Sequence, residues 1–240
     1  MREMCELKRH HLEWIHAHRE MGRCFPRDGF HLFTTPDRYD YAVNCDCRAA
    51  KQITLSRVQR MMKTLGVGYT FARWRDGSQP EAEAAVGKIL AGGTRGLILI
   101  GPTGTGKTHL AKALIYALSE AGTRCQFIHA AQLSRLFGAS QGFGFDAEAA
   151  AKELARIETA DVVVIDDLGS QRKTASEVFE EQFPPLLDAI ALHGGRLVIT
   201  TNLKGDALNA SIGAKAKSRL AGMCDPAFTT GKDQRGAAHA

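Results

Sequence analysis

The sequence contains no long hydrophobic run, and this absence argues against a membrane-spanning protein. A transmembrane helix needs about 20 consecutive apolar residues, whereas the apolar runs here have the length of single strands, as in VVVI at 162–165. The first residues, MREMCELKRHHLEW, hold no apolar signal core. We therefore expect a cytoplasmic protein with no membrane partner.

Most of the chain lacks an excess of positive or negative charge. Residues 76–240 carry 17 Lys and Arg against 18 Asp and Glu, a net charge of −1. Residues 1–75 carry 14 against 8, so the formal net charge of +5 comes from the N-terminal part. A basic module beside a neutral one suggests an acidic partner, either nucleic acid or an acidic protein surface. A solvated basic surface without such a partner fits the same numbers.

Disulfides are not expected, because the cytoplasm keeps thiols reduced. Four of the six cysteines and five of the nine histidines nevertheless lie in the first fifth of the chain. The segment NCDC spaces two cysteines more tightly than the usual zinc pattern Cys-x₂₋₄-Cys. We interpret Cys24, Cys45 and Cys47 as candidate Zn²⁺ ligands with an unassigned fourth partner, and free thiols are the alternative. A metal would help to stabilise a module too small to bury much core.

The N-terminal part is expected to be a small, mostly helical module. Apolar spacing predicts helices over 4–21 and 49–65, and an irregular segment over 22–47, where proline and glycine interrupt the pattern. The polar, turn-rich stretch WRDGSQPEAEAAV follows. We predict a module over 1–75, a linker over 76–85 and a second domain over 86–240.

The second domain shows the alternation that is typical of a parallel α/β fold. Short apolar segments alternate with helix-length amphipathic ones, and near-continuous apolar strands fit burial on both faces of a sheet. The expected strands span 96–100, 125–130, 162–166 and 196–202, and the expected helices span 107–121, 130–158 with a break at GASQGFGF, and 176–193. The sequence thus predicts a parallel sheet sandwiched by helices.

A phosphate-binding loop (P-loop) lies between the first of these strands and the first helix. The segment GPTGTGKT matches G-x-x-x-x-G-K-[ST] in the strand-to-helix context that this motif requires. Its glycines let backbone N–H groups face phosphate oxygens, while the Lys107 ammonium would neutralise the β- and γ-phosphates and the Thr108 hydroxyl would ligate Mg²⁺. The candidate nucleotide-binding residues are Gly101, Pro102, Thr103, Gly104, Thr105, Gly106, Lys107, Thr108 and His109.

Two later strands end in polar residues that suit ATP hydrolysis. VVVIDDLG ends on an acid pair, in which Asp166 is the candidate partner of Thr108 in holding Mg²⁺ and Asp167 would orient or deprotonate an attacking water. In VITTN, Thr201 and Asn202 are neutral groups that could position that water. A small-molecule kinase does not need a water-directed acid, and no segment here looks like an acceptor site or a lid. We therefore predict an ATPase that uses ATP and Mg²⁺.

These three elements, in this order, resemble an AAA+ ATPase, and more closely the DnaC/DnaI/IstB group of replicative helicase loaders and transposition ATPases. GPTGTGKTHLAKAL, VIDDLG and VITTNL carry the resemblance over roughly residues 94–205. The resemblance implies that Arg219 is an arginine finger acting on a neighbouring subunit's ATP, that Arg235 contacts the nucleotide, and that the N-terminal module binds zinc. Two departures concern subunit contacts: LLDAIALHGGRL stands where an Arg-Tyr-like pair is usual, and Ser218 stands where an acidic residue commonly precedes the finger.

The leading hypothesis that the resemblance supports is an ATP-dependent loader of a replicative DNA helicase. Such a protein would bind Mg-ATP and single-stranded DNA, associate with itself through the ATP interface, and hold the helicase with its basic N-terminal module. The alternative is an IstB-like ATPase that remodels target DNA for a transposase. A third interpretation is a nucleotide-gated binding adaptor with negligible ATP turnover.

Overall fold

The structure, a computed structural model, divides the chain into two units. Contacts between residues separate Met1–Thr64 from Leu65–Ala240, so the division falls before the expected linker at 76–85. The described residues are 23–25, 30–34, 40–44, 65–66, 68–74, 77–93, 95–142, 145–171, 176–231 and 233.

The N-terminal unit contains an antiparallel sheet in the segment expected to be irregular. Its strands are β1 (Arg23–Phe25), β2 (Phe30–Thr34) and β3 (Asp40–Asn44), paired in the order β1-β2-β3. The expectation for 22–47 was therefore wrong. Aromatic residues favour strands, and the prolines and glycine fall between the strands. The helix expected over 4–21, and all of that over 49–65 except Leu65, lie outside the described residues.

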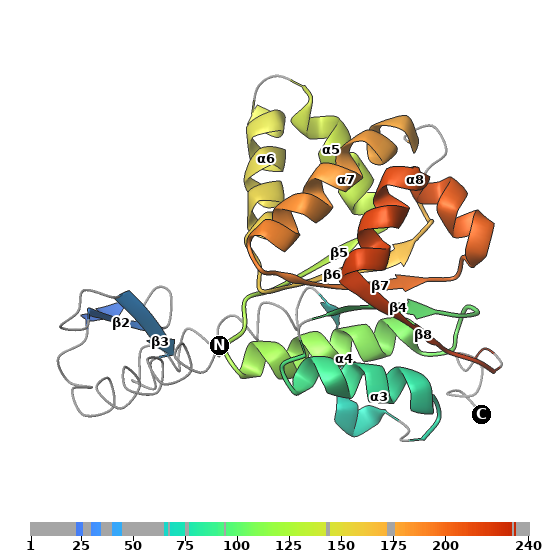
Figure 1. Ribbon diagram of the computed structural model, residues 1–240, viewed down its shortest axis with the longest axis horizontal. Coiled ribbons are helices and arrows are strands. Elements are labelled where there is room, and N and C mark those ends of the chain that lie inside the picture. The colour runs from blue at the N-terminus through green and yellow to red at the C-terminus, as the bar shows by residue number, and fades with distance from the viewer. Residues whose placement is uncertain are drawn as a thin grey trace. The chain divides into compact units, whose positions relative to one another are not determined.

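The second unit is built on a five-stranded parallel sheet in the order β5-β6-β7-β4-β8 (Figure 1). The four strands expected from the sequence are confirmed to within one or two residues at their ends, and the fifth was not predicted. Fully buried apolar side chains run along β6 and β7, which lie between two neighbours. The strands are β4 (Gly96–Ile100), β5 (Cys125–His129), β6 (Val162–Leu168), β7 (Arg196–Thr201) and β8 (Cys224–Phe228).

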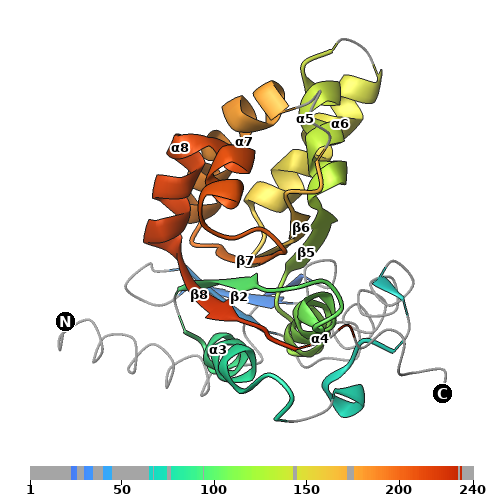
Figure 2. The same cartoon turned by 90° about the vertical axis from the view of Figure 1, so that its right-hand side faces the viewer.

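Helices cover both faces of this sheet. In Figures 1 and 2, α3 and α4 lie on one face, and α5, α6, α7 and α8 lie on the other. No helix in the described part of the chain combines the length and the apolar character that a bilayer crossing requires. The helices are α3 (Pro80–Leu90), α4 (Lys107–Glu120), α5 (Ala130–Ser140), α6 (Phe145–Glu158), α7 (Ser176–Leu192) and α8 (Gly205–Met223), preceded by the short 3₁₀ helix η2 (Phe71–Arg73).

Helix α3 occupies more than half of the segment expected to be a linker. It begins at Pro80, a residue that suits the first helical turn, and the acidic Glu81 and Glu83 favour the positive end of the helix dipole. Its buried residues, Ala82, Val86 and Ile89, share one face and cover the sheet. The acidic and alanine-rich stretch is therefore part of the folded unit.

The largest part of the core lies between the sheet and α5, α7 and α8. The Phe179 ring stands 4.8 Å from that of Phe183 and 5.6 Å from that of Phe137, centroid to centroid, and all three are buried. Below these rings lie apolar side chains of the central strands. The cluster includes Ile128, Leu133, Ile157, Val163, Ile165, Leu168, Leu186, Leu187, Ile190, Leu197, Ile199, Ile212 and Leu220.

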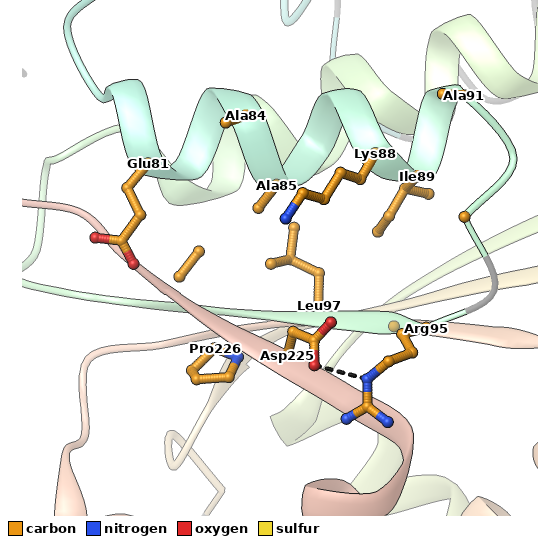
Figure 3. Close-up of a pocket in the computed structure, with 13 residues that line it drawn as sticks. Glu81, Ala84, Ala85, Lys88, Ile89, Ala91, Arg95, Leu97, Asp225 and Pro226 are labelled. Atoms are coloured by element: carbon orange, nitrogen blue, oxygen red, sulfur yellow. Dashed lines mark hydrogen bonds and ion pairs between the residues drawn. The ribbon is translucent and has the colours of Figure 1, made fainter.

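Strand β8 forms one edge of the sheet, beside a hollow of about 680 Å³ between α3 and strands β4 and β8 (Figure 3). The outward N–H of Phe228 donates to Glu81 Oε1 at 3.0 Å. Pro226, two residues earlier on the same side of the strand, has no N–H to offer. The Arg95 guanidinium donates to the Asp225 carboxylate at 2.6 Å. Side chains of α3 and of Arg95, the residue just before β4, therefore occupy much of this edge.

Candidate nucleotide-binding site

A cavity of about 830 Å³ opens where β4, β6 and β7 end. The carboxyl edge of a parallel sheet is the usual place for a ligand site in such folds. The cavity is bordered by the P-loop, by polar residues at the ends of three other strands, and by a segment that precedes α3. Its lining residues are Tyr69, Arg73, Trp74, Ser78, Thr103, Gly104, Gly106, Lys107, Thr108, His109, His129, Asp166, Asp167, Thr200 and Asn202.

The P-loop glycines are required by backbone conformation and by close packing. Gly104 and Gly106 have φ of 79° and 93°, in the left-handed region that side chains disfavour. A Cβ on Gly101 would collide with Thr229, which follows β8. The hydroxyl of buried Thr105 lies 2.7 Å from that of Thr229 and donates to the Pro102 carbonyl at 2.9 Å. The loop is thereby fixed from inside, and its outer surface faces the cavity.

Lys107 is the first residue of α4 and brings a positive charge into the loop. Its side chain is 6% exposed, and its Nζ donates to the carbonyl oxygens of Gly101 at 2.8 Å and Pro102 at 2.7 Å. The amino end of a helix carries partial positive charge and unpaired N–H groups. The Lys107 ammonium, the amino end of α4 and the glycine loop together form a site that favours a polyphosphate.

Asp166 is the most buried acid of the cavity, with 2% of its surface exposed. Its Oδ1 accepts hydrogen bonds from the hydroxyls of Thr108 at 2.9 Å and Thr200 at 2.6 Å. Its Oδ2 lies 3.1 Å from Nδ1 of His129. Because Thr108 donates its proton to the carboxylate, the lone pairs of its hydroxyl oxygen stay available to a cation.

Asp167 is turned into the cavity by an irregularity in β6. Its φ of 58° is the one left-handed conformation of a non-glycine residue among the described residues, and the β6–β7 register shifts between Ile165 and Leu168. Such a bulge re-aims a side chain, and aspartate tolerates this backbone region better than most residues. The Asn202 amide donates to Asp167 Oδ1 at 3.1 Å. The two side chains expected to orient the attacking water, those of Asp167 and Asn202, are therefore neighbours.

Thr200, rather than Thr201, belongs to this cavity. Thr200 Oγ1 donates to Asp166 and accepts the backbone N–H of Asp167 at 2.8 Å. Thr201 Oγ1 instead donates to the Leu168 carbonyl and accepts the Leu203 N–H. Side chains alternate along a strand, so the two threonines face opposite sides of the sheet, a signal that the sequence already contains.

The segment before α3 borders the site and was not predicted to do so. Three side chains of α4 contact its backbone carbonyls: Lys112 Nζ donates to Leu65 at 2.8 Å, Tyr116 Oη donates to Gly66 at 2.8 Å, and His109 Nε2 lies 3.0 Å from the Thr70 oxygen. Burial lowers the pKa of Lys112 and raises that of Tyr116. Residues 65–74, expected to belong to the N-terminal module, thus pack on the helix that follows the P-loop.

Trp74 closes one side of the cavity. Its ring lies against Gly106, where a Cβ would collide with it, and its centroid is 5.3 Å from that of His109. The indole N–H donates to Glu83 Oε1 at 2.8 Å. Although burial alone would raise the pKa of Glu83, hydrogen bonds from Trp74, Gln79 and Gly77 lower it below its ordinary value. An aromatic wall is thereby held beside the phosphate loop.

A family model described as IstB-like ATP binding protein matches residues 40–216. The chain belongs to this family. The match covers every residue that lines the cavity, so this cavity is the candidate ATP site of the IstB-like protein. No curated protein matches the sequence.

Solved structures of three named proteins show the same fold. A structure of DnaI has 22% sequence identity and a TM-score of 0.58, covering 72% of this chain and 93% of that one. The DnaC helicase loader has 23% identity and a TM-score of 0.57, covering 72% and 99%. The replication initiator DnaA, bound to AMPPCP and single-stranded DNA, has 17% identity and a TM-score of 0.59, covering 70% and 51%. The resemblance to DnaC/DnaI/IstB-like AAA+ ATPases is confirmed, and so is the parallel α/β fold of P-loop NTPases.

The ligands available in this IstB-like site suit Mg²⁺. Thr108 and Asp166 converge beside Lys107 through hydroxyl and carboxylate oxygens, which magnesium prefers. Within the described ranges there is no group of three or more His, Cys, Asp or Glu side chains arranged to hold a metal. A cation here would complete its shell with phosphate and water oxygens, as Mg²⁺ usually does.

Five of the other predicted site residues lie elsewhere or outside the described part. Arg219 lies on α8, apart from the cavity lining, and its guanidinium forms a two-pronged ion pair with Asp188 of α7, at 2.6 and 2.7 Å. Cys45, Cys47 and Arg235 lie outside the described residues, and Cys24 is in β1. The zinc site and the nucleotide contact of Arg235 stay predictions.

Proposed function

We propose that this IstB-like ATPase loads a replicative DNA helicase onto single-stranded DNA in a cycle driven by ATP hydrolysis. The observation that carries the proposal is the extent of the shared fold. It spans 93% of the DnaI chain and 99% of the DnaC helicase loader chain, but 51% of the DnaA chain. The basic N-terminal part would supply the surface that holds an acidic partner.

Hydrolysis is assigned to groups that already face one another across the cavity. Lys107 would neutralise phosphate charge, while Thr108 and Asp166 would hold Mg²⁺, which polarises the phosphoryl oxygens when it is bound. Asp167 would accept a proton from the attacking water, and Asn202, which donates to Asp167, would fix the direction of its carboxylate. This set fits an ATPase better than a binding adaptor with negligible turnover.

Arg219 is proposed to complete the site of a neighbouring subunit. It lies away from the cavity of its own chain and pairs with Asp188. An exposed ion pair of this kind is weak, so a triphosphate on a second subunit could compete for the guanidinium. ATP hydrolysis would then depend on association, as a loading cycle requires.

A transposition ATPase is the second candidate, because the matching family model is named for IstB. Its catalytic centre would contain the same residues. The partner therefore decides between the two functions.

The deciding experiment is co-purification of the full chain with a replicative helicase and, separately, with a transposase, each with and without ATP. ATP-dependent retention of the helicase, together with its transfer to circular single-stranded DNA, supports the loader. Retention of the transposase alone favours the second candidate, and retention of neither contradicts both.

Two variants sharpen this test. Lys107→Ala should lose nucleotide binding and ATP-dependent retention together, because the phosphate charge loses its cation. Arg219→Ala should bind nucleotide like the unmodified protein but lose the stimulation of hydrolysis by association. Equal loss of binding in both variants would contradict the role of Arg219 on a second subunit.

A further inference from the structure

His129 makes a contact with the Mg²⁺-side carboxylate that the P-loop, the acid pair and the VITTN segment do not account for. It is the last residue of β5, and the parallel pairing of β5 with β6 places it directly beside Asp166. Side chains of such partners project from the same face of a sheet. The register of the two strands therefore brings this imidazole and this carboxylate together.

The geometry of the contact defines the role of each ring nitrogen. Nδ1 of His129 lies 3.1 Å from Oδ2 of Asp166. An ionised carboxylate accepts only, so this bond requires the proton to be on Nδ1. Oδ1 of the same carboxylate is engaged by Thr108 and Thr200. Three donors thus fix both oxygens of the acid.

The ring is held in place and also faces the cavity. The Phe127 ring meets it edge to face, with centroids 5.2 Å apart and planes at 89°. The His129 side chain is 53% exposed, compared with 3% for Asp166, and it lines the same cavity as Lys107. It is therefore the solvent-side support of a carboxylate whose other donors come from within the fold.

We propose that His129 is a positioning residue for magnesium in the nucleotide site. By donating to Oδ2, it stops the Asp166 carboxylate from rotating and keeps Oδ1 turned toward Thr108. Groups that orient a metal-binding residue in this way typically change metal affinity by about 10- to 100-fold when they are removed. The inference rests on the ATPase part of the proposed function and is independent of the helicase or transposase partner.

The test measures binding rather than turnover. A fluorescent ATP analogue is titrated with Mg²⁺ in the full chain, and the Mg²⁺ concentration that gives half of the magnesium-dependent binding is recorded. His129→Leu, which removes the donor, should raise that concentration about tenfold, while binding of the analogue in EDTA stays unchanged. His129→Asn should need a Mg²⁺ concentration within about threefold of that of the unmodified protein. Its amide nitrogen branches from the same side-chain carbon, Cγ, as Nδ1 of histidine does.

Two controls separate positioning from general damage. His129→Gln places its amide one carbon farther out and should behave like the leucine variant. His193→Leu, at an exposed position just after α7, should behave like the unmodified protein. An unchanged Mg²⁺ requirement in His129→Leu overturns the proposal, and so does an asparagine variant as impaired as the leucine one. If the unmodified protein bound no analogue at all, the ATPase function itself would fail, a result distinct from either of these.

Discussion

The most direct test of the site concerns Thr200, whose single hydroxyl makes two hydrogen bonds. Its Oγ1 donates to the carboxylate of Asp166 at 2.6 Å and accepts the backbone N–H of Asp167 at 2.8 Å, and 1% of the residue is exposed. Thr200→Val keeps the shape of the side chain and removes both bonds. We expect it to weaken the fold and the magnesium site together.

The size of the effect follows from the groups left without a partner. A hydrogen bond to a charged group contributes about 1.5–3 kcal/mol, and a buried N–H without an acceptor costs about 1–3 kcal/mol. Since both bonds share one hydroxyl, these values do not simply add. We expect Thr200→Val to lower the free energy of unfolding by about 3 kcal/mol. Thr200→Ser keeps the hydroxyl and should lose about 1 kcal/mol for its missing methyl group.

The assay is urea unfolding followed by the emission of Trp74 in a Trp14→Phe background, so that the signal comes from the ATPase unit. Thr201→Val is the matched control. Its buried hydroxyl also makes two hydrogen bonds, to Leu168 and Leu203, but neither involves an acid. It should lower stability by about 1–3 kcal/mol and leave the Mg²⁺ requirement of nucleotide binding unchanged.

Two results would refute this reasoning. If Thr200→Val unfolds at the urea concentration of the unmodified protein, the hydroxyl is not the support that its distances indicate. If both valine variants change the Mg²⁺ requirement equally, the effect is loss of structure rather than loss of a bond to Asp166.

Three further predictions concern other contacts of the ATPase unit. Nucleotide binding should change tryptophan emission in the Trp14→Phe variant and not in Trp74→Phe, because Trp74 lines the cavity. Folding lowers the pKa of Glu83 from its ordinary value of 4.5. The ionised carboxylate therefore contributes its full stabilisation above that pH, and the contribution is lost as the pH falls through the folded pKa. Urea unfolding at a series of falling pH values should show this loss, and the Glu83→Gln variant should not show it. Asp188→Asn frees Arg219 from its ion pair and should raise ATP hydrolysis about two- to fivefold at limiting protein concentration, whereas lower hydrolysis would mean that the pair orients the guanidinium for its task.

The parts of the fold that the sequence predicts are those with a strong local pattern. Strands such as 96–100 are short apolar runs, and their buried positions on a two-sided sheet explain why no polar residue interrupts them. Strand β8 was not predicted because it has no continuous apolar pattern. It is an edge strand, where polar Asp225 and Pro226 are tolerated. Helix α8 was also not predicted, since it is interrupted at Gly213, which has non-helical φ and ψ. Tertiary position, which has no local signature, decides both elements.

The predicted site shows the same division. The P-loop and the acid pair could be located because their chemistry requires particular residue types at fixed spacing. The contribution of residues 65–74 could not, because α4 holds that segment largely through backbone carbonyls, which every residue has. His129 was missed for a related reason: its contact with Asp166 depends on which strands are neighbours and in what register.

The protected edge at β8 limits the ways in which copies of this chain can associate. A sheet grows by offering N–H and C=O groups to another strand. Along β8, proline removes one donor and Glu81 takes another. Continuous pairing through this edge is therefore disfavoured, and any contact there would rest on side chains, which can be formed and released without unpairing backbone. Association of many copies would then carry less risk of irreversible aggregation through this edge.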